Sequence, residues 1–427
     1  MKKIIRKIAP NFLINFYHFG LAFLGAVLYF FPSRKMKIIG VTGTNGKSTV
    51  VYLISKILEE AGFSVGSVST IKFKIKDREW LNTLKMTMPG RFKLQKFLRQ
   101  ALNQGCQYVV VEVSSEGLLQ SRHKFIDFDA AIFTNLTPEH IETHGSFEKY
   151  REAKGKLFKS LRGSKKSKTT SIINLDDPNA DYFLKFEADR KIGYGLNSEP
   201  TDKVSNFLKA IKTEATDQGL KFVLADTTFN LKLRGVFNIY NSLSAIASAL
   251  SQGIDLKTCK RALEKIEVVS GRMEEVISSP FKVFVDYAHT PDALSKAYSA
   301  LPKDSLKICV LGSCGGGRDK WKRPKMGEIA SQFCNQIILT NEDPYDDNPV
   351  QIIKEIASGI QNQSIGLTEI LDRREAIKQA LALAKKGDTV IITGKGSEPW
   401  MCVAGAKKIP WDDREIAREE FKKLTLR

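Results

Sequence analysis

Cysteine is scarce in this sequence, and its six cysteines show no pattern of a structural role. They form neither metal-ligand pairs nor the framework of a disulfide-rich scaffold. This spacing argues against a cysteine-bound metal and against a small disulfide-stapled fold. We therefore expect reduced thiols, as in a cytosolic protein, at Cys106, Cys259, Cys309, Cys314, Cys334 and Cys402.

Internal repeats, long low-complexity stretches and nucleic-acid-binding modules are also absent. Acidic residues are in the minority, because 47 Asp and Glu stand against 66 Lys and Arg, a formal net charge of +19. The basic residues are spread over the chain without an aromatic-interleaved stripe, so we expect no nucleic-acid partner. The positive field favours phosphorylated substrates and a membrane surface. Residues 162–170, RGSKKSKTT, indicate a basic surface loop.

Only one long apolar run is present, at Leu13–Phe31. It is about long enough to cross a hydrocarbon core and is flanked by basic residues on both sides, at Lys2, Lys3, Arg6, Lys7, Arg34, Lys35 and Lys37. No small-residue cleavage site follows, which argues against a cleaved signal peptide. Two alternatives stay open for residues 1–35: a membrane-associated segment or a helix packed on the protein's own domain.

The most informative stretch is residues 37–49, KIIGVTGTNGKST, in which an apolar strand runs into a glycine-bracketed turn. Such a turn directs backbone N–H groups at a phosphate, and the following helix adds its positive end. Lys47 would reach the β and γ phosphates, and the Ser48 hydroxyl would hold Mg²⁺. The pattern predicts ATP and Mg²⁺ as cofactors, with ATP bound by Gly43, Thr44, Asn45, Gly46, Lys47, Ser48 and Thr49.

Apolar β-branched runs alternate with helical patterns from Met36 onward, which is typical of a mostly parallel sheet covered by helices. We expect an α/β fold, with a phosphate-loop central domain at 36–270 and a Rossmann-like C-terminal domain at 271–427. The predicted central strands are Lys37–Val41, Tyr108–Val113, Ala130–Phe133 and Ser171–Asn174. The predicted central helices are Lys47–Ala61, Arg91–Gln104, Phe147–Leu161 and Asn238–Ser251. The predicted C-terminal strands are Lys282–Val285, Leu306–Leu311, Gln336–Leu339 and Thr389–Ile392.

Ten motifs follow one another from Lys37 to the C-terminus: GTNGKST, EVSSEGL, TNLTPEHIETHG, YREAKGKLF, NLDDP, GVFNIYN, SGRME, VDYAHTPDAL, GGGRDKWKRPKMG and GKGSE. This ordered set resembles the Mur ligase family. VDYAHTPDAL resembles most the members that add the third residue to the UDP-N-acetylmuramoyl dipeptide. The resemblance implies that the γ-phosphoryl group of ATP passes to a substrate carboxylate, and that an amino acid's amine then displaces phosphate. Such chemistry needs positioning and cations rather than an enzyme nucleophile.

The resemblance also implies the catalytic and metal-binding residues. Glu112 and His140 match the family's metal ligands, and Lys154 matches its carbamylated lysine, which helps to position a second Mg²⁺. The implied catalytic set is Lys47, Glu112, His140 and Lys154, and the implied metal set is Ser48, Glu112, His140 and Lys154.

Further residues are carried over by matching positions. For the nucleotide they are Asn238 and Asn241 in the central domain. From the C-terminal domain, Arg272, Asp286 and His289 would contact the ribose and phosphates. For the UDP-sugar peptide they are Thr87, Met88, Ser114, Gln120 and Arg122. For the amino acid they are Arg318, Glu342, Asp343, Pro344, Tyr345, Gly394 and Glu398.

Several positions depart from the family's pattern. Tyr345 stands where diaminopimelate-adding members carry an arginine, so the guanidinium that would bind a distal carboxylate is missing. This departure argues against diaminopimelate and favours lysine or another diamino acid as the substrate. Glu116 and Ser397 replace family histidines, and Ser270 replaces a proline. About three dozen residues precede the phosphate loop, which is too few for the family's uridine-binding domain.

The leading hypothesis is a cytoplasmic, ADP-forming ligase of peptidoglycan synthesis, with a UDP-N-acetylmuramoyl-peptide and an amino acid as partners. Two alternatives stay open. One is a related ligase that modifies a lipid-linked precursor, with the N-terminal segment attached to the inner face of the membrane. The other is a membrane-tethered nucleotide-binding protein without catalysis.

Overall fold

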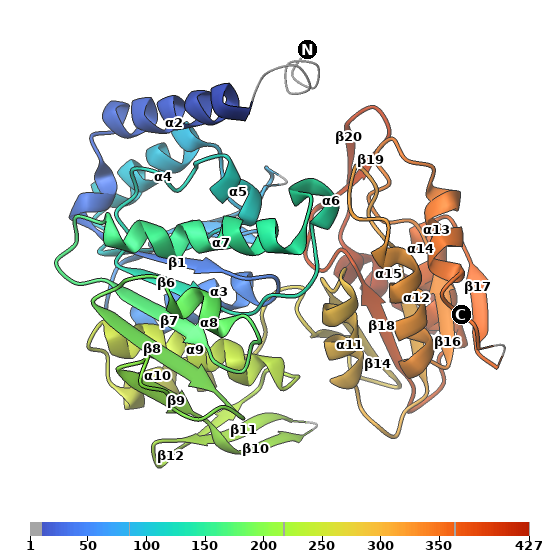
Figure 1. The fold of residues 1–427 in the computed structure, drawn as a ribbon. Helices are drawn as coiled ribbons and strands as arrows, with labels where there is room; N and C mark the ends of the chain where they lie inside the picture. The colour runs from blue at the N-terminus through green and yellow to red at the C-terminus, as the bar shows by residue number, and fades with distance from the viewer. Residues whose placement is uncertain (1–10, 85, 217, 363, 427) are drawn as a thin grey trace.

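The computed structural model describes residues 11–84, 86–216, 218–362 and 364–426. The basic residues Lys2, Lys3, Arg6 and Lys7 lie outside this part of the chain. The chain forms two α/β lobes that lie side by side, the first built on β1–β12 and the second on β13–β20 (Figure 1). The expected α/β class, with a mostly parallel sheet followed by a second α/β unit, is confirmed.

A nine-stranded sheet forms the first lobe, and all of its pairs are parallel except β2–β3 and β3–β4. Its strands are, in spatial order, β4 (Arg78–Leu81), β3 (Lys72–Ile75), β2 (Val65–Val68), β5 (Tyr108–Glu112), β1 (Lys37–Thr42), β6 (Ala130–Phe133), β7 (Thr170–Asn174), β8 (Arg190–Gly195) and β9 (Asn206–Lys209). The central strands are buried on both faces, which explains their continuous apolar runs.

Helices cover both faces of this sheet. The core on one face is made with α3 (Lys47–Glu60), α9 (Phe237–Ser251) and α10 (Leu256–Glu264). The core on the other is made with α4 (Arg91–Asn103), α5 (Ser115–Leu119), α7 (Phe147–Arg162) and α8 (Ala180–Leu184). A small antiparallel sheet follows β9, formed by β10 (Ile211–Thr216), β11 (Gly219–Leu224) and β12 (Thr227–Leu231).

The second lobe holds a six-stranded sheet that is parallel except for the β13–β14 pair. Its order is β13 (Glu274–Ile277), β14 (Lys282–Asp286), β18 (Thr389–Thr393), β15 (Lys307–Leu311), β16 (Gln336–Leu339) and β17 (Gly366–Glu369). One face packs on α11 (Pro291–Ser299), α12 (Lys322–Phe333) and α13 (Pro349–Ala357), and the other on α14 (Arg373–Leu383) and α15 (Asp413–Thr425). A hairpin, β19 (Trp400–Val403) and β20 (Lys407–Pro410), completes the lobe.

All twelve predicted elements are present, with ends that differ by one residue at most. The basic loop is shorter than predicted, because Thr169 and Thr170 are buried and Thr170 begins β7. The strands of the small antiparallel sheet were not predicted. The first of them, β10, is exposed along its whole length, so it lacks an alternating apolar pattern.

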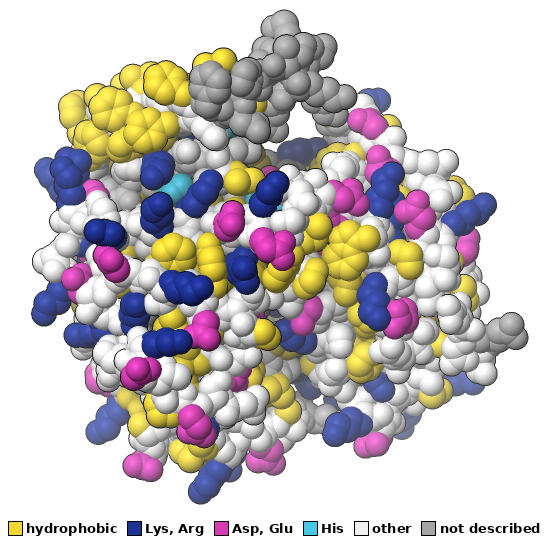
Figure 2. Space-filling view, in the orientation of Figure 1, with side chains coloured by type: hydrophobic (Ala, Val, Ile, Leu, Met, Phe, Trp, Pro, Cys, Tyr) yellow, Lys and Arg dark blue, Asp and Glu magenta, His cyan; other side chains and the backbone are white. Residues whose placement is uncertain are grey.

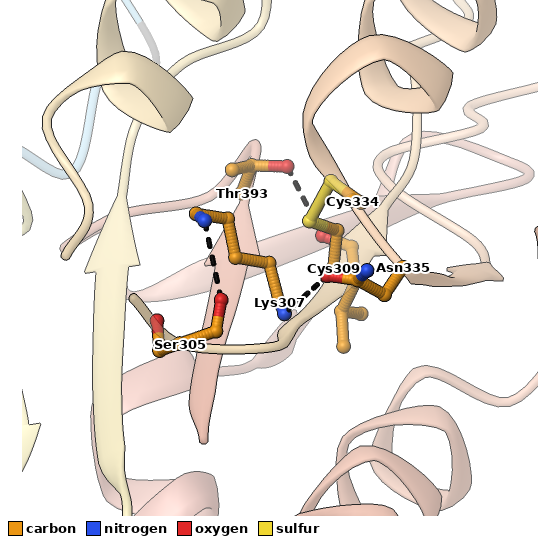
Figure 3. Close-up of a disulfide and its surroundings, with 7 residues drawn as sticks. Ser305, Lys307, Cys309, Cys334, Asn335 and Thr393 are labelled. Atoms are coloured by element: carbon orange, nitrogen blue, oxygen red, sulfur yellow. Dashed lines mark hydrogen bonds between the residues drawn. A yellow bond between two sulfur atoms is a disulfide. The ribbon is translucent and has the colours of Figure 1, made fainter. Parts of the chain in front are cut away.

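Two cysteines contradict the expectation of six reduced thiols. Cys309 and Cys334 form a disulfide with a Cα–Cα distance of 6.1 Å (Figure 3). Cys309 lies in β15, and Cys334 follows α12, which returns the chain to β16 beside β15. The fold therefore joins residues that are 25 positions apart, a separation that gives no local signal. Cys106, Cys259, Cys314 and Cys402 are free.

The N-terminal apolar run forms α2 (Asn11–Leu28), followed by the short 3₁₀ helix η1 (Pro32–Lys35). Ala22, Gly25 and Ala26 are buried, and α2 packs along α4 at the edge of the first lobe (Figure 1). No helix in the described ranges is long and apolar enough to cross a membrane. One side of α2 packs on the first lobe, and its opposite side is exposed.

Candidate active site between the two lobes

The turn after β1 has the geometry of a phosphate-binding loop. Gly43 and Gly46 have positive φ angles, 151° and 83°. A Cβ on Gly43 would lie 1.9 Å from the Thr134 hydroxyl oxygen, and one on Gly46 would lie 2.4 Å from the Asn241 carbonyl oxygen. Both positions therefore require glycine. Because α3 begins at Lys47, its positive N-terminal end opens into the cleft.

A cavity of about 990 Å³ lies in front of this turn and is lined from both lobes. All seven predicted turn residues, Gly43 to Thr49, line it. From the rest of the first lobe come Thr87, Glu112, Ser114, Arg122, His140, Lys154 and Asn241. From the second lobe come Arg272, Asp286, His289 and Arg318. This volume is in the range of small-molecule sites.

Lys47 is folded back onto the turn, where its ammonium donates to the Thr44 carbonyl at 2.7 Å. Burial lowers the pKa of this lysine, and the nearby Arg272 guanidinium lowers it further, while Glu112 acts in the opposite direction. An incoming polyphosphate would offer this ammonium the anionic partner that the turn carbonyl now replaces.

Glu112, at the end of β5, forms an oxygen-rich group with Ser48. The Ser48 hydroxyl donates to one carboxylate oxygen at 2.8 Å, and the Thr70 amide donates to the same oxygen at 2.7 Å. The Thr70 hydroxyl donates to the other oxygen at 3.0 Å. Hydroxyl and carboxylate oxygens are ligands that Mg²⁺ prefers, so Ser48 and Glu112 fit such an ion. No group of three or more His, Cys, Asp and Glu side chains suited to a metal occurs among the described residues.

Lys154, on α7, is 2% exposed and lies behind the phosphate turn. Its amine donates to the Gly43 carbonyl at 2.6 Å and lies 4.4 Å from the centre of the Tyr150 ring. Burial, and then the charge of Lys47, hold its pKa well below the usual range. A lowered pKa favours the neutral, nucleophilic form of a lysine amine.

His140 caps the short helix α6 (Ile141–His144) with a φ of 59°. Its Nδ1 lies 3.3 Å from a guanidinium nitrogen of Arg318 in the second lobe. Burial, followed by the charge of Arg318, holds the pKa of His140 well below its usual value, so the ring is neutral. A neutral ring keeps a lone pair for a metal or a proton.

The second lobe faces the turn with three predicted nucleotide residues. The Arg272 guanidinium lies 4.4 Å from the centre of the Tyr287 ring. Asp286 accepts from the amides of Met273 and Ala288, both at 2.7 Å, and burial raises its pKa. Burial likewise holds the pKa of His289 well below its usual value.

Asn238 does not line the cavity, unlike Asn241. Its amide donates to the Arg234 carbonyl at 2.7 Å, and its side-chain oxygen accepts from Asn241 at 2.8 Å. Asn238 therefore orients Asn241, which reaches the phosphate turn at Gly46.

Some of the predicted UDP-sugar-peptide residues line the cavity, and others support them from behind. Thr87, Ser114 and Arg122 line the cavity, whereas Met88 and Gln120 do not. Arg122 donates to the Met88 carbonyl and, at 2.9 Å, to the Gln120 side-chain oxygen. Met88 and Gln120 thus hold Arg122 in place rather than facing the cleft.

Most predicted amino-acid residues form a buried cluster beside the cavity. Of this set only Arg318 lines it, and Glu342, Asp343, Pro344, Tyr345, Gly394 and Glu398 do not. Asp343 is engaged by the Lys395 ammonium at 2.8 Å and by the Cys402 amide at 2.7 Å. Glu398 accepts from Lys395 at 2.6 Å.

Glu342 differs from its neighbours in this cluster. It is 4% exposed, its Oε2 has no hydrogen-bond partner, and it packs against Gly394. Burial raises its pKa to about 7. Glu342 is thus the carboxylate of the cluster that retains an unused oxygen.

Several site residues escaped the sequence analysis. Thr70 and Tyr150 line the cavity and contact Glu112 and Lys154. Glu139 and Lys322 form a buried ion pair between the lobes, and Asp319 accepts from the amides of Ile141 and Glu142. The motifs TPEHIETHG and GGGRDKWKRPKMG contain Glu139, Asp319 and Lys322, so membership of these motifs could have identified the three as site residues. Thr70 lies in no motif.

Comparison with known proteins agrees with this geometry. The "UDP-N-acetylmuramoyl-L-alanyl-D-glutamate--2,6-diaminopimelate ligase" of Caldanaerobacter subterraneus subsp. tengcongensis is 39% identical over 406 residues, covering 94% of this chain and 81% of the relative. The "UDP-N-acetylmuramyl-tripeptide synthetase" of Roseiflexus sp. is 36% identical over 426 residues, covering 95% and 82%. A solved structure of a UDP-N-acetylmuramoyl-L-alanyl-D-glutamate--2,6-diaminopimelate ligase has a TM-score of 0.62 at 31% identity, covering 91% of this chain and 79% of that one.

Family domains match both lobes. Residues 41–249 match the Mur ligase middle domain, and residues 271–396 match the domain described as Mur ligase, glutamate ligase domain. The chain belongs to the Mur ligase family.

Proposed function

We propose that this protein is an ATP-dependent ligase that joins the carboxylate of a UDP-N-acetylmuramoyl-peptide to the amine of an amino acid, forming the third residue of the peptide. The observation that carries the proposal is the shared cavity between the lobes. There a phosphate turn, a Ser48–Glu112 oxygen group and the basic residues Arg272 and Arg318 meet. The names of the relatives support the same reaction.

The first step transfers the γ-phosphoryl group of ATP to an oxygen of the acceptor carboxylate. The bond between the β–γ bridging oxygen and the γ phosphorus breaks, a bond from that phosphorus to the carboxylate oxygen forms, and ADP leaves. The amides of the turn and Lys47 would hold the β and γ phosphates in line. Ser48 and Glu112 would hold Mg²⁺, which when bound neutralises phosphate charge.

The second step forms the amide. The neutral amine attacks the acyl carbon, the carbon–oxygen bond to phosphate breaks, and inorganic phosphate leaves with the electron pair. The nitrogen loses its extra proton to solvent. Arg318 and its neighbour His140 lie at the lobe boundary, where they would face the charge that develops on the acyl phosphate.

We further propose that Lys154 is carbamylated. Its lowered pKa gives the free amine that adds to CO₂, and one proton is released when the carbamate forms. The resulting carboxylate would add oxygen ligands beside Ser48, Glu112 and His140, at a second Mg²⁺ position. The remaining nucleotide contacts that we propose are Asn241, Arg272, Asp286 and His289, with Asn238 behind them.

For the amino acid we propose a side chain that ends in an ammonium and lacks a distal carboxylate. Tyr345 supplies no cation for such a carboxylate, whereas Glu342 keeps an oxygen unpaired next to Gly394. An ammonium would give Glu342 the partner that a buried carboxylate requires. Lysine has a side chain of this kind, whereas diaminopimelate carries a distal carboxylate.

An ADP-release screen tests the proposal. The purified protein is given ATP, Mg²⁺ and UDP-N-acetylmuramoyl dipeptide with one amino acid at a time. We expect ADP release that depends on the dipeptide, with lysine-like amino acids preferred over diaminopimelate by at least tenfold. No release with any amino acid rejects the ligase, and a preference for diaminopimelate rejects the substrate assignment alone.

A second candidate acceptor is a lipid-linked analogue of the peptide. The helix α2 favours it, because its outer side is apolar and it adjoins the acceptor residues through Arg91, which contacts both His18 and the Gln120 carbonyl. We accordingly propose a cytoplasmic enzyme attached to the inner face of the membrane by residues 1–35, with domains at 36–270 and 271–427. Faster ADP release with a lipid-linked acceptor than with the soluble dipeptide would favour this candidate.

A further inference from the structure

The helix α2 is packed on one side only. Ala22, Gly25 and Ala26 recur at helical spacing and are buried against the first lobe, where small side chains permit a close approach to α4. Phe19 and Phe23 lie partly over the same lobe, with ring centres 5.1 and 5.3 Å from that of Phe125. These contacts fix α2 along the edge of the lobe rather than projecting from it (Figure 1).

The opposite side of α2, here called the outer face, consists of exposed apolar residues. Its main members are between 43% and 75% exposed, at Leu13, Phe16, Tyr17, Leu24, Val27 and Leu28. Residues 13–30 hold nine of the 23 exposed large apolar side chains in the described part of the chain. In Figure 2, hydrophobic side chains gather at the upper left of the molecule, over α2. Patches of this kind mark interaction surfaces, whereas scattered apolar residues do not.

Basic residues border the outer face, and acidic ones are missing from its supporting elements. Within α2, η1 and α4 there is no Asp or Glu, while Lys35, Arg91, Lys93, Lys96 and Arg99 are present. Arg34 of η1 is also basic, but it forms an ion pair with Asp127 at 3.4 Å. Lys35, Lys93 and Lys96 are exposed. In Figure 2, Lys and Arg side chains lie along the lower border of the apolar patch. An apolar centre with a cationic border is complementary to acyl chains beneath anionic headgroups.

We propose that the outer face of α2 docks in the plane of an anionic membrane surface. The helix lies flat, with Phe16, Leu24 and Leu28 entering the acyl region and the flanking lysines contacting lipid phosphates. This arrangement agrees with the finding that no described helix is able to span a bilayer. A second copy of the chain is a poorer occupant, because it would bring the same positive border against this one in a protein of net charge +19.

Docking by this face would turn the acceptor side of the active site toward the bilayer. Arg91 contacts His18 of α2 and donates to the Gln120 carbonyl at 2.9 Å, and Gln120 in turn holds Arg122 of the cavity. This orientation rests on the proposed function, since it assigns Arg122 to the acceptor. The docking face itself does not depend on the reaction.

Vesicle flotation of the full-length protein tests the proposal. The probes are vesicles of phosphatidylcholine alone and vesicles with 30% phosphatidylglycerol, a composition chosen for its negative charge. We expect the protein to float with the anionic vesicles and at least tenfold less with the neutral ones. Phe16→Glu/Leu24→Glu should lower flotation at least tenfold. The matched control, Leu306→Glu/Leu371→Glu, changes exposed apolar residues of the second lobe and should float like the unmodified protein.

Three results would overturn the proposal. The first is equal flotation of the outer-face variant and the control. The second is a stable dimer in light scattering that the outer-face variant abolishes, without vesicle binding by either protein. The third is unchanged flotation of Lys93→Glu/Lys96→Glu on anionic vesicles, which would remove the charge argument. Thermal melting shows whether each variant is folded. ADP release with the soluble dipeptide is scored separately, so a failed ligase and a failed docking face give different results.

Discussion

Lys322 of the second lobe donates to Glu139 of the first at 2.9 Å, and both side chains are almost completely buried, at 1% and 4% exposure. The same ammonium also donates to the His289 carbonyl at 2.9 Å. This ion pair therefore links the loop that carries His140 to the lobe that carries Arg272 and His289. It is one of several contacts that join the two halves of the cavity.

Breaking this pair should open the cleft. Lys322→Met would leave Glu139 as a buried carboxylate without a partner, at a cost of about 3–5 kcal/mol, which separation of the lobes relieves. We expect a larger radius of gyration in small-angle X-ray scattering and at least tenfold slower ADP release. Lys325→Met, which removes a half-exposed ion pair on the same helix, should change neither. Scattering and turnover identical to the unmodified protein would contradict the role of Lys322.

Lys47 of the phosphate turn should be required for turnover. Lys47→Ala should reduce amino-acid-dependent ADP release by about 100-fold or more, because it removes a cation placed against developing phosphate charge. Its melting temperature should stay close to that of the unmodified protein, since burial already lowers the pKa of this lysine and disfavours its charged form. Lys56→Ala, which removes a partly exposed ion pair with Glu59 on the same helix, is the control. Unchanged turnover would reject the turn as the phosphate site.

How much of this site was predictable follows from where its residues lie. The residues of the phosphate turn, Glu112, His140 and Lys154 stand in motifs with fixed spacing, and the fold brings them all to one cavity. Their neighbours were less predictable. Thr70, which holds Glu112 by two hydrogen bonds, lies between two short strands and belongs to no motif. Its role arises from the pairing of β2 with β5, which composition and periodicity do not encode.

The same limit applies to the second lobe and to the disulfide. Asp343 matched a substrate-binding position, yet in the structure it is paired with Lys395 and the Cys402 amide. Only the three-dimensional arrangement distinguishes it from Glu342, whose oxygen is unpaired. Likewise Cys309 and Cys334 meet because α12 returns the chain to β16 beside β15, a tertiary event with no local sequence pattern.

The disulfide should stabilise the second lobe. A loop of this length predicts about 3.5 kcal/mol from the lowered entropy of the unfolded chain. We expect urea unfolding of the lobe to shift to lower urea when dithiothreitol is present. Cys309→Ala/Cys334→Ala should unfold at a similarly low urea concentration and should not respond to dithiothreitol, which makes it the matched control. A double variant that still responds to the reductant would show that another thiol is responsible.

Glu342 should make stability depend on pH. Burial raises its pKa from an ordinary value of 4.5 to about 7, so the folded state binds a proton more tightly than the unfolded state does. Its destabilising effect is absent below about pH 4.5, grows as the pH rises toward 7 and is complete above it, at about 3 kcal/mol. Glu342→Gln should therefore be more stable than the unmodified protein at pH 8 and equal to it at pH 4.5. Glu369→Gln, at an exposed position of β17, should behave like the unmodified protein at both pH values.

The same variant should lose amino-acid binding if Glu342 recognises an ammonium. Above pH 7 the unmodified protein carries the charged carboxylate, so the KM for a lysine-like substrate should fall as the pH rises from 6 to 8. Glu342→Gln should raise that KM at least tenfold at pH 8 and should remove its pH dependence over this range, while the KM for ATP stays unchanged. A protein that gained stability but kept its KM would show that Glu342 is buried without contacting the amino acid. Both results together would mean that Glu342, which packs against Gly394, lowers the stability of the protein but is needed for substrate binding.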